Sequence, residues 1–315
     1  SMGCGSDTLA RWENSIRNIK NIENGYAIKN LFKKFNEVPA IILGGGPSVE
    51  DFIKAYKEKD LSDKAVIIAC DAILGKLLNE GVTPHFVIRC ERKETTIFRG
   101  VTNEKTDGIF YVAYPWTSPN FFNLFRDYFV AYRDNGICLW TGFKPGSLNG
   151  GVSAANAGLE LAINMGCSPI IFSGIDLCFI DNKSHVSGTE MEFDPDKSKA
   201  KWNEIECNDK EKRTSIPVWL RCLSEYEHTI FKKKLKSVIN TSLKGAKIAL
   251  TTYKPFEELS LSRPFDIKGR IKENLVKVGP GDYDNIRQKT LIYLRDLKND
   301  FTKLLSFVDD TMITG

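Results

Sequence analysis

Residues 41–51 read I-I-L-G-G-G-P-S-V-E-D, an apolar run that ends in three glycines, a proline and a serine. We expect a buried strand over residues 40–43, because every side chain there is apolar. Ser48 and Asp51 have the spacing of a capping box, which predicts a helix from that point to about Lys57. Glycines between a strand and a helix have three ordinary explanations: a tight turn, close packing of the helix on the strand, or a bound phosphate.

The same order of elements returns along the chain. The next predicted elements are a strand over residues 65–69 with Asp71 at its end, a helix to Glu80, a stop at Gly81 and a strand over residues 86–90. Further strands are predicted over residues 109–113, 137–140, 169–172 and 238–240, and further helices over residues 152–165 and 217–236. Fully apolar strands that alternate with helices predict a doubly wound α/β fold of the Rossmann type, with helices on both faces of a mostly parallel sheet.

The flanking regions differ from this central pattern. Residues 1–36 are expected to form a helical N-terminal arm, and residues 37–260 the Rossmann-like domain. Within that domain, residues 181–215 turn polar and show no clear strand, which indicates a functional lid or an insertion. Residues 261–315 carry apolar residues at helical spacing and are expected to form a C-terminal helical appendage.

The composition argues against several classes of protein. The chain has 315 residues with 44 basic and 40 acidic side chains, so its net charge of +4 is too small to indicate a nucleic-acid partner. Its 8 cysteines are scattered without a C-x-x-C pair, which predicts reduced thiols in a cytoplasmic protein, with no disulfide framework or zinc site. No stretch approaches the roughly 18 apolar residues that a membrane span needs.

The glycine loop consists of Gly44, Gly45, Gly46, Pro47 and Ser48. It lacks the Gly-Lys-Ser/Thr of a Walker loop, and a valine stands where the dinucleotide fingerprint has its third glycine. The loop nevertheless joins the first strand of the domain to its first helix, where backbone N–H groups and the positive end of the helix dipole favour an anion. Packing alone is the competing explanation.

Acidic residues and a second glycine turn are expected at the same edge of the sheet. Asp71 and Glu91 end the second and third strands, where an acid can bind a ribose or a base, or hold a metal. Asp71 could equally be a helix N-cap, and Glu91 a surface partner of Arg92. The turn in residues 146–158 suits either phosphate contact or tight packing. A later strand ends at this edge with Ser173, Gly174 and Asp176.

Four stretches, taken in order, carry a resemblance to a known family. They are G-G-G-P-S-V at 44–49, C-D-A-I-L-G-K-L-L-N-E-G-V-T-P-H-F-V-I-R-C-E-R at 70–92, N-G-G-V-S-A-A-N-A-G-L-E-L-A-I-N-M-G-C-S-P-I-I-F-S-G-I-D-L at 149–177, and S-H-V-S-G-T at 184–189. Over residues 10–250 the chain resembles the motility-associated factor family, which shares a core with archaeal 6-hydroxymethylpterin diphosphokinases and is similar to family 42 bacterial sialyltransferases. The resemblance implies transfer of a nonulosonic acid, such as pseudaminic or legionaminic acid, from a CMP-sugar to flagellin without a metal.

The resemblance also implies roles for individual residues. His185 matches the histidine that acts as general base in the sialyltransferases. Leu177-Cys178-Phe179 stand where those enzymes place the tyrosines that hold the leaving phosphate, which leaves that group to Arg213 or to backbone amides. Donor contacts are implied for the glycine loop and for Asp71, Glu91, Asn149, Gly150, Gly151, Ser173, Gly174 and Asp176.

Residues and resemblance together predict an inverting glycosyltransferase that moves a sialic-like acid from a CMP-sugar to a hydroxyl acceptor. His185 is its base, and no cofactor or metal is required. Two other functions stay open: a Mg²⁺-dependent diphosphotransferase of the pterin type, and a catalytically silent nucleotide-sugar-binding protein of a glycan operon. The expected acceptors are a glycan, a lipid-linked sugar or a protein, flagellin among them. No nucleic-acid partner and no membrane span are expected, and the oligomeric state is left open.

Overall fold

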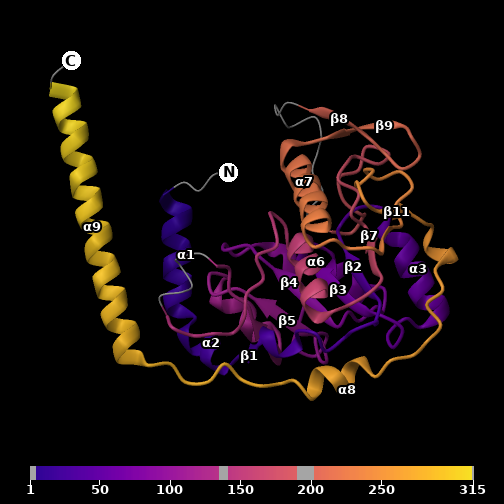
Figure 1. The fold of residues 1–315 in the computed structure, drawn as a ribbon, viewed down its shortest axis with the longest axis horizontal. Coiled ribbons are helices and arrows are strands. Elements are labelled where there is room, and N and C mark those ends of the chain that lie inside the picture. The colour runs from indigo at the N-terminus through magenta and orange to yellow at the C-terminus, as the bar shows by residue number, and fades with distance from the viewer. Residues whose placement is uncertain (1–4, 135–140, 190–201, 314–315) are drawn as a thin grey trace.

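A nine-stranded sheet lies at the centre of the computed structural model, which describes residues 5–134, 141–189 and 202–313 (Figure 1). Its strand order is β1-β6-β5-β4-β3-β2-β7-β10-β11, and each pairing between neighbours is parallel. The strands are β1 (Tyr26–Ala27), β2 (Ala40–Leu43), β3 (Val66–Cys70), β4 (Phe86–Arg89), β5 (Phe110–Ala113), β6 (Asp127–Val130), β7 (Ile170–Ser173), β10 (Val238–Asn240) and β11 (Thr252–Tyr253).

The central strands are buried on both faces. Every residue of β2, β3 and β7 is buried. Both faces of each strand are therefore shielded from water, and side chains on both faces are apolar. β2 pairs with both of the other strands, and Leu43 lies beside Ala69 on one side and Ser173 on the other. Burial on both faces is the reason that these strands lack alternation in the sequence, and it confirms the predicted parallel sheet.

The order of strands reverses direction between β2 and β7. From β2 the chain adds β3, β4, β5 and β6 on one side, whereas β7 and β10 are added on the other. In open parallel sheets this reversal leaves a crevice beyond the carboxyl ends of the two strands, where ligands bind. Here the glycine loop follows β2 and residues 174–176 follow β7 at that position.

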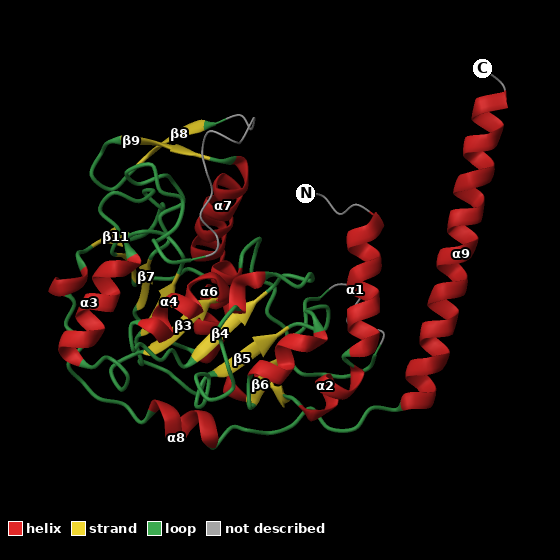
Figure 2. Cartoon of the chain, turned by 180° about the vertical axis from the view of Figure 1, so that it is seen from behind, coloured by secondary structure: helices red, strands yellow, loops and turns green. Residues whose placement is uncertain are grey.

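Helices cover both faces of the sheet, as Figure 2 shows from behind. Adjacent residues of β4 point to opposite faces. Ile88 lies 3.9 Å from the place of a Cβ on Gly158 of α6, whereas Val87 belongs to a separate cluster with Leu74 of α4. The helices of the domain are α3 (Val49–Lys59), α4 (Asp71–Asn79), α6 (Ala154–Met165) and α7 (Pro217–Lys232), with the short 3-10 helices η1 (Ile28–Leu31), η2 (Thr96–Phe98), η3 (Pro119–Leu124) and η5 (Phe256–Glu258).

The N-terminal arm is only partly helical. α1 (Gly5–Arg17) and α2 (Ile19–Asn24) confirm its first part. The expectation of helix as far as residue 36 is wrong at β1, where Tyr26 and Ala27 pair with Phe129 and Val130 of β6. Pairing at the edge of the sheet satisfies backbone groups that a helix end would leave open.

The C-terminal belt, residues 254–281, crosses from the β11 edge of the sheet to the β1 edge (Figure 1). Its helix α8 (Ile267–Lys272) buries two isoleucines in the main core. At the far edge the Ala27 N–H donates to the Val276 carbonyl at 2.9 Å, and the Val278 N–H donates to the Gly25 carbonyl at 2.9 Å. The belt is therefore tied to the first strand of the chain.

α9 (Tyr283–Ile313) follows the belt and rises beside α1, away from the sheet (Figures 1 and 2). The rings of Trp12 and Tyr293 stack with their centroids 4.4 Å apart and join the two helices. This helix confirms the one predicted near the C-terminal end of the sequence. Across the part of the chain that the structure describes, no helix combines the length and apolar character that crossing a bilayer requires.

Part of the predicted lid folds as a hairpin. β8 (Asn203–Glu206) pairs antiparallel with β9 (Lys212–Ser215), so the expectation of no strand in residues 181–215 is wrong there. The paired side chains are mostly polar, and they give no apolar alternation from which a strand could be predicted. The strand expected over residues 137–140 lies outside the described residues.

Candidate functional site

The glycine loop and the segment after β7 approach each other backbone to backbone. The Gly44 N–H donates to the Ser173 carbonyl at 2.9 Å, and the Gly46 N–H donates to the Gly174 carbonyl at 2.8 Å. A Cβ on Gly44 would collide with the Gly174 carbonyl, and Gly174 has a φ of +69°, where L side chains are strained. A Cβ on Gly46 would collide with the Asp176 carboxylate, so close packing accounts for two of the three loop glycines, Gly44 and Gly46.

Ser48 does not cap α3 with its side chain, contrary to the expected capping box. Its hydroxyl donates to the Asp176 carboxylate and accepts from the Gly174 N–H at 3.1 Å, while its own N–H donates to Asp176 Oδ2 at 2.9 Å. The hydroxyl thus bridges two loops, so it cannot also bond the first turn of the helix. Among the described residues, the Gly45 N–H forms no hydrogen bond, in contrast to the amides of Gly44, Gly46 and Ser48.

Asp176 is buried, with 2% of its surface exposed, and it connects the segments that follow β2, β7 and β10. Besides Ser48 from the β2 loop, Ser242 from the segment after β10 donates to Asp176 Oδ1 at 2.6 Å. Burial raises the pKa of this carboxyl, and the hydrogen bonds from Ser242 and Ser48 oppose the shift. With these donors in place, Asp176 fixes the shape of the loops and has little capacity left for a ligand.

His185 lies directly over the glycine loop. The Val186 N–H donates to the Gly45 carbonyl at 2.8 Å, which anchors the segment after β7 to the loop. A Cβ on Gly45 would lie 2.9 Å from His185 Cδ2 and 3.8 Å from Nε2. The other ring nitrogen, Nδ1, is 3.2 Å from the Ser184 hydroxyl. Gly45, the remaining loop glycine, therefore leaves room for an imidazole.

Asp71 follows β3 at the same edge, as the first residue of α4, and is paired with a buried cation, a partner that was not predicted from the sequence. Arg89, 1% exposed at the end of β4, donates to Asp71 Oδ2 and also to the Lys93 carbonyl at 2.9 Å. Burial raises the pKa of Asp71, and the guanidinium opposes that shift. An arginine closing the apolar run F-V-I-R was the available signal, since an arginine is seldom fully buried unless it is paired.

Glu91 and the second glycine turn lie farther along the edge. Glu91 is exposed and accepts from the Arg92 N–H at 2.9 Å. Asn149 donates to Asp134 Oδ2 at 2.7 Å. The next two residues, Gly150 and Gly151, pack against Asn156 of α6, which favours tight packing at this turn. The Gly150 carbonyl accepts from a second unforeseen cation, Arg133, at 3.1 Å.

Arg213 lies on the β8–β9 hairpin, where both of its terminal nitrogens donate to Asp209. The two distances are 2.7 and 2.6 Å, a bidentate pair. The pairing neutralises the guanidinium that the sequence suggested for a leaving phosphate. The structure thus gathers the glycine loop, Asp176, Asp71 and His185 at the carboxyl ends of β2, β3 and β7, and it holds Arg213 in an ion pair of its own.

The carboxylates at this edge do not fit a magnesium site. Asp71 is paired with Arg89, Asp176 is surrounded by hydroxyl and amide donors, and Glu91 is exposed. Mg²⁺ requires oxygen ligands in octahedral reach. Within the described residues, no three His, Cys, Asp or Glu side chains group closely enough to hold a metal ion.

Comparisons with known proteins agree with this architecture. A solved structure, the MAf glycosyltransferase from Magnetospirillum magneticum AMB-1, is similar with a TM-score of 0.68 over 92% of this chain and 44% of its own, at 22% sequence identity. The chain thus spans less than half the length of that protein, and the likeness establishes the fold. A comparison with curated proteins finds no match.

The family that matches is described as 6-hydroxymethylpterin diphosphokinase MptE-like, and it matches residues 13–182. The match includes the glycine loop, Asp71, the second glycine turn and Asp176, and it ends three residues before His185. It covers more than half of the chain and confirms the core that the sequence motifs indicated. The chain therefore belongs to the 6-hydroxymethylpterin diphosphokinase MptE-like family.

Proposed function

We propose that the protein is a glycosyltransferase that moves a nonulosonic acid from a CMP-sugar to a hydroxyl acceptor, with inversion at the anomeric carbon. The proposal rests on the position of the His185 ring over Gly45. Parallel α/β sheets bind their ligands beyond the carboxyl ends of the strands, which supports a role in the reaction for an imidazole at this edge. The fold shared with the MAf glycosyltransferase supports the same class of reaction.

His185 has the position of a general base. When Nδ1 carries the ring hydrogen and donates to the Ser184 hydroxyl, Nε2 is the nitrogen that accepts a proton. The acceptor hydroxyl loses its proton to Nε2 as its oxygen bonds to the anomeric carbon, and the bond from that carbon to the phosphate oxygen breaks. One displacement gives the inverted glycoside, CMP and an imidazolium.

The leaving phosphate needs positive charge at the same edge of the sheet. Three of the loop amides are engaged within the protein, so we assign the phosphate to the Gly45 N–H. No metal is part of this scheme.

The family description favours a second candidate, a diphosphotransferase acting on a pterin-like alcohol. Such a reaction needs Mg²⁺ to bridge the phosphates of ATP. The pairing of Asp71 with Arg89 and of Asp176 with Ser48 and Ser242 argues against it. Activity that persists in EDTA would separate the two.

The experiment measures CMP release from a CMP-nonulosonic acid by wild type and by His185→Ala. We expect the variant to bind CMP as wild type does and to lose about 10²- to 10⁴-fold in turnover, the range for a lost general base. The matched control is His228→Ala, which removes an exposed histidine on α7. Equal turnover in the two variants contradicts the role of His185, and a wild type that releases no CMP supports a silent binding protein.

A further inference from the structure

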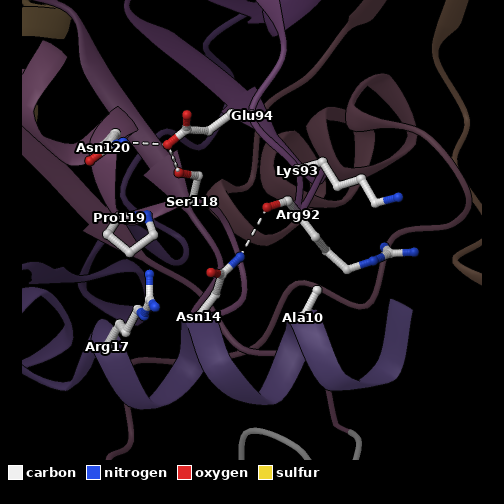
Figure 3. A pocket seen from close by; sticks show the side chains of 9 residues that line it. All are labelled: Ala10, Asn14, Arg17, Arg92, Lys93, Glu94, Ser118, Pro119 and Asn120. Atoms are coloured by element: carbon white, nitrogen blue, oxygen red, sulfur yellow. Dashed lines mark hydrogen bonds between the residues drawn. The ribbon is translucent and has the colours of Figure 1, made fainter. Parts of the chain in front are cut away.

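Two places away from the site described above hold groups that could bind or react. The first is a cavity of about 370 Å³ between α1 and the loops after β4 and β5 (Figure 3). Asn14 Nδ2 donates to the Arg92 carbonyl at 2.9 Å, and Glu94 Oε1 accepts from the Ser118 hydroxyl at 3.0 Å, so the protein itself uses these groups. The Arg92 and Lys93 side chains point away from the other lining residues. The second place, a pair of buried thiols, has the geometry of a reactive site.

Cys178 and Cys207 lie side by side at the β8–β9 hairpin. Cys178 belongs to the segment after β7, and Cys207 follows β8. Their sulfur atoms are 3.9 Å apart, and the two residues are 1% and 0% exposed. A disulfide has a sulfur–sulfur distance of about 2.0 Å, so each sulfur would move by roughly 1 Å to form one. The fold therefore places two thiols within reach of a covalent bond.

Hydrogen bonds hold the segment after β7 against the hairpin on both sides of Cys178. The Phe179 N–H donates to the Thr214 carbonyl of β9 at 2.9 Å. The Ser215 hydroxyl donates to the Leu177 carbonyl at 2.7 Å. The position of this thiol beside the hairpin is thus fixed by its two neighbours in the chain.

The two thiols differ in acidity. A hydrogen bond from the Cys178 thiol and the nearby Arg213 guanidinium lower the pKa of Cys207 to about 7, although burial opposes the shift. The same hydrogen bond raises the pKa of Cys178, which keeps its proton. Burial alone raises the pKa of Cys167 to about 12. Since the thiolate is the form that attacks an oxidant, Cys207 is the reacting sulfur and Cys178 the resolving one.

The thiols belong to a small cluster that is separate from the main core. Besides the two cysteines, this cluster contains Ile180 and, at its margin, Ile205 of the mostly exposed strand β8. A region with so few buried apolar contacts opens at a lower free energy than the core does. Opening of the hairpin would therefore admit a small oxidant to sulfur atoms that are covered in the closed form.

We propose that Cys178 and Cys207 form a redox-active pair that hydrogen peroxide oxidises to a disulfide. The Cys207 thiolate attacks one peroxide oxygen, the O–O bond breaks, and a sulfenic acid and a hydroxide ion form. The Cys178 sulfur then bonds to the Cys207 sulfur as the S–O bond breaks, and its proton leaves with the hydroxyl group as water. Two electrons pass from the thiols to the peroxide, which becomes two molecules of water.

The disulfide would fasten the hairpin to the segment that leads to His185. It would close a loop of 29 residues, and a cross-link of this kind stabilises a protein mainly by restricting its unfolded chain. The oxidised protein should therefore melt at a higher temperature than the reduced protein. The oxidation does not depend on the glycosyltransferase function proposed above.

The test treats the reduced protein with a small excess of hydrogen peroxide at neutral pH. Peptide mapping by mass spectrometry should find Cys178 linked to Cys207, and dithiothreitol should remove the link. The melting temperature should rise by about 2 °C or more on oxidation. Cys207→Ser should form no link and show no rise. The matched control, Cys167→Ser, removes a buried thiol that has no sulfur partner in the described part of the chain, and it should form the link as wild type does.

Cys178→Ser tests the order of the two steps. It leaves the reacting sulfur without its resolving partner, so the sulfenic acid should persist at Cys207 and be trapped there by dimedone. Three outcomes would overturn the proposal: no link in oxidised wild type, a link from either residue to a different cysteine in its place, or a dimedone adduct at Cys178 in Cys207→Ser with none at Cys207 in Cys178→Ser.

Discussion

The contact between Gly45 and His185 makes a sharp prediction at the scale of single residues. A methyl group on Gly45 would stand 2.9 Å from His185 Cδ2, closer than carbon atoms pack, so the imidazole has to shift. Shifts of this size at a reacting group cost about 10²-fold in rate. We expect Gly45→Ala to lower turnover at least tenfold in the CMP-release assay.

Gly75 of α4 provides the matched control. No atom lies within 4 Å of the place of its Cβ, so Gly75→Ala meets open space. Alanine also stabilises a helix interior by about 1 kcal/mol relative to glycine. Turnover should stay at the wild-type value and the melting temperature should not fall. A loss of turnover in both variants, or in neither, would show that the room beside Gly45 is not what positions the imidazole.

At the scale of elements, one ion pair links the end of β3 and the start of α4 to the end of β4. Arg89 is 1% exposed, and its guanidinium also lies over the Phe121 ring at 4.4 Å. Removing the arginine leaves the Asp71 carboxylate, whose side chain is 13% exposed, without its cation. We expect Arg89→Leu to lower the free energy of unfolding by about 3–5 kcal/mol, measured by urea denaturation.

The double variant Asp71→Leu/Arg89→Leu tests the cause. It removes both charges, so it should recover at least half of the loss seen in Arg89→Leu. A double variant as unstable as the single one would mean that the packing of Arg89 on the Phe121 ring, and not the unpaired charge, dominates.

Whether a strand could be predicted depends on how many of its side chains are buried. β2 was predicted to the residue, since its side chains are buried on both faces and the glycines end the run. β6 was missed because its first two residues are only partly buried, and β8 because three of its four residues are exposed. A strand that pairs through its backbone while its side chains face water leaves no hydrophobic pattern.

The site residues also divide into those that the sequence could predict and those that it could not. The glycine loop and Asp71 could be placed at the sheet edge from the order of strands and helices alone, and His185 came from the resemblance. The bond from Ser242 to Asp176 spans 66 residues and the Asp71–Arg89 pair spans 18, so only the folded chain brings these partners together. The sequence could not show that these contacts within the protein occupy the loop amides and carboxylates that a ligand was expected to use.

At the scale of the whole molecule, the C-terminal belt should matter more to stability than the helix that follows it. Ile267 and Ile271 of the belt and Ile286 at the start of α9 are each at least 96% buried, and burying such a side chain contributes about 1.5–3 kcal/mol. We expect a chain ending at residue 262 to lose at least about 4 kcal/mol of unfolding free energy, or to fail to fold.

A chain ending at residue 287 is the control for that truncation. It keeps the three isoleucines and the belt's bonds to Gly25 and Ala27, and it loses residues 288–313 of α9, whose side chains are mostly exposed as far as residue 306. Its urea midpoint should lie close to that of the full chain. Similar midpoints for both truncated chains would show that the belt adds little to the sheet.

The route of the belt also decides how the molecule would carry a mechanical load. Tension applied between the two termini reaches the hydrogen bonds that join Gly25 and Ala27 to Val276 and Val278 before it reaches the central strands. Those few bonds would open first and lengthen the connection between the termini, while β2 and β7 stay paired. The glycine loop and His185 are thereby shielded from force transmitted along α9.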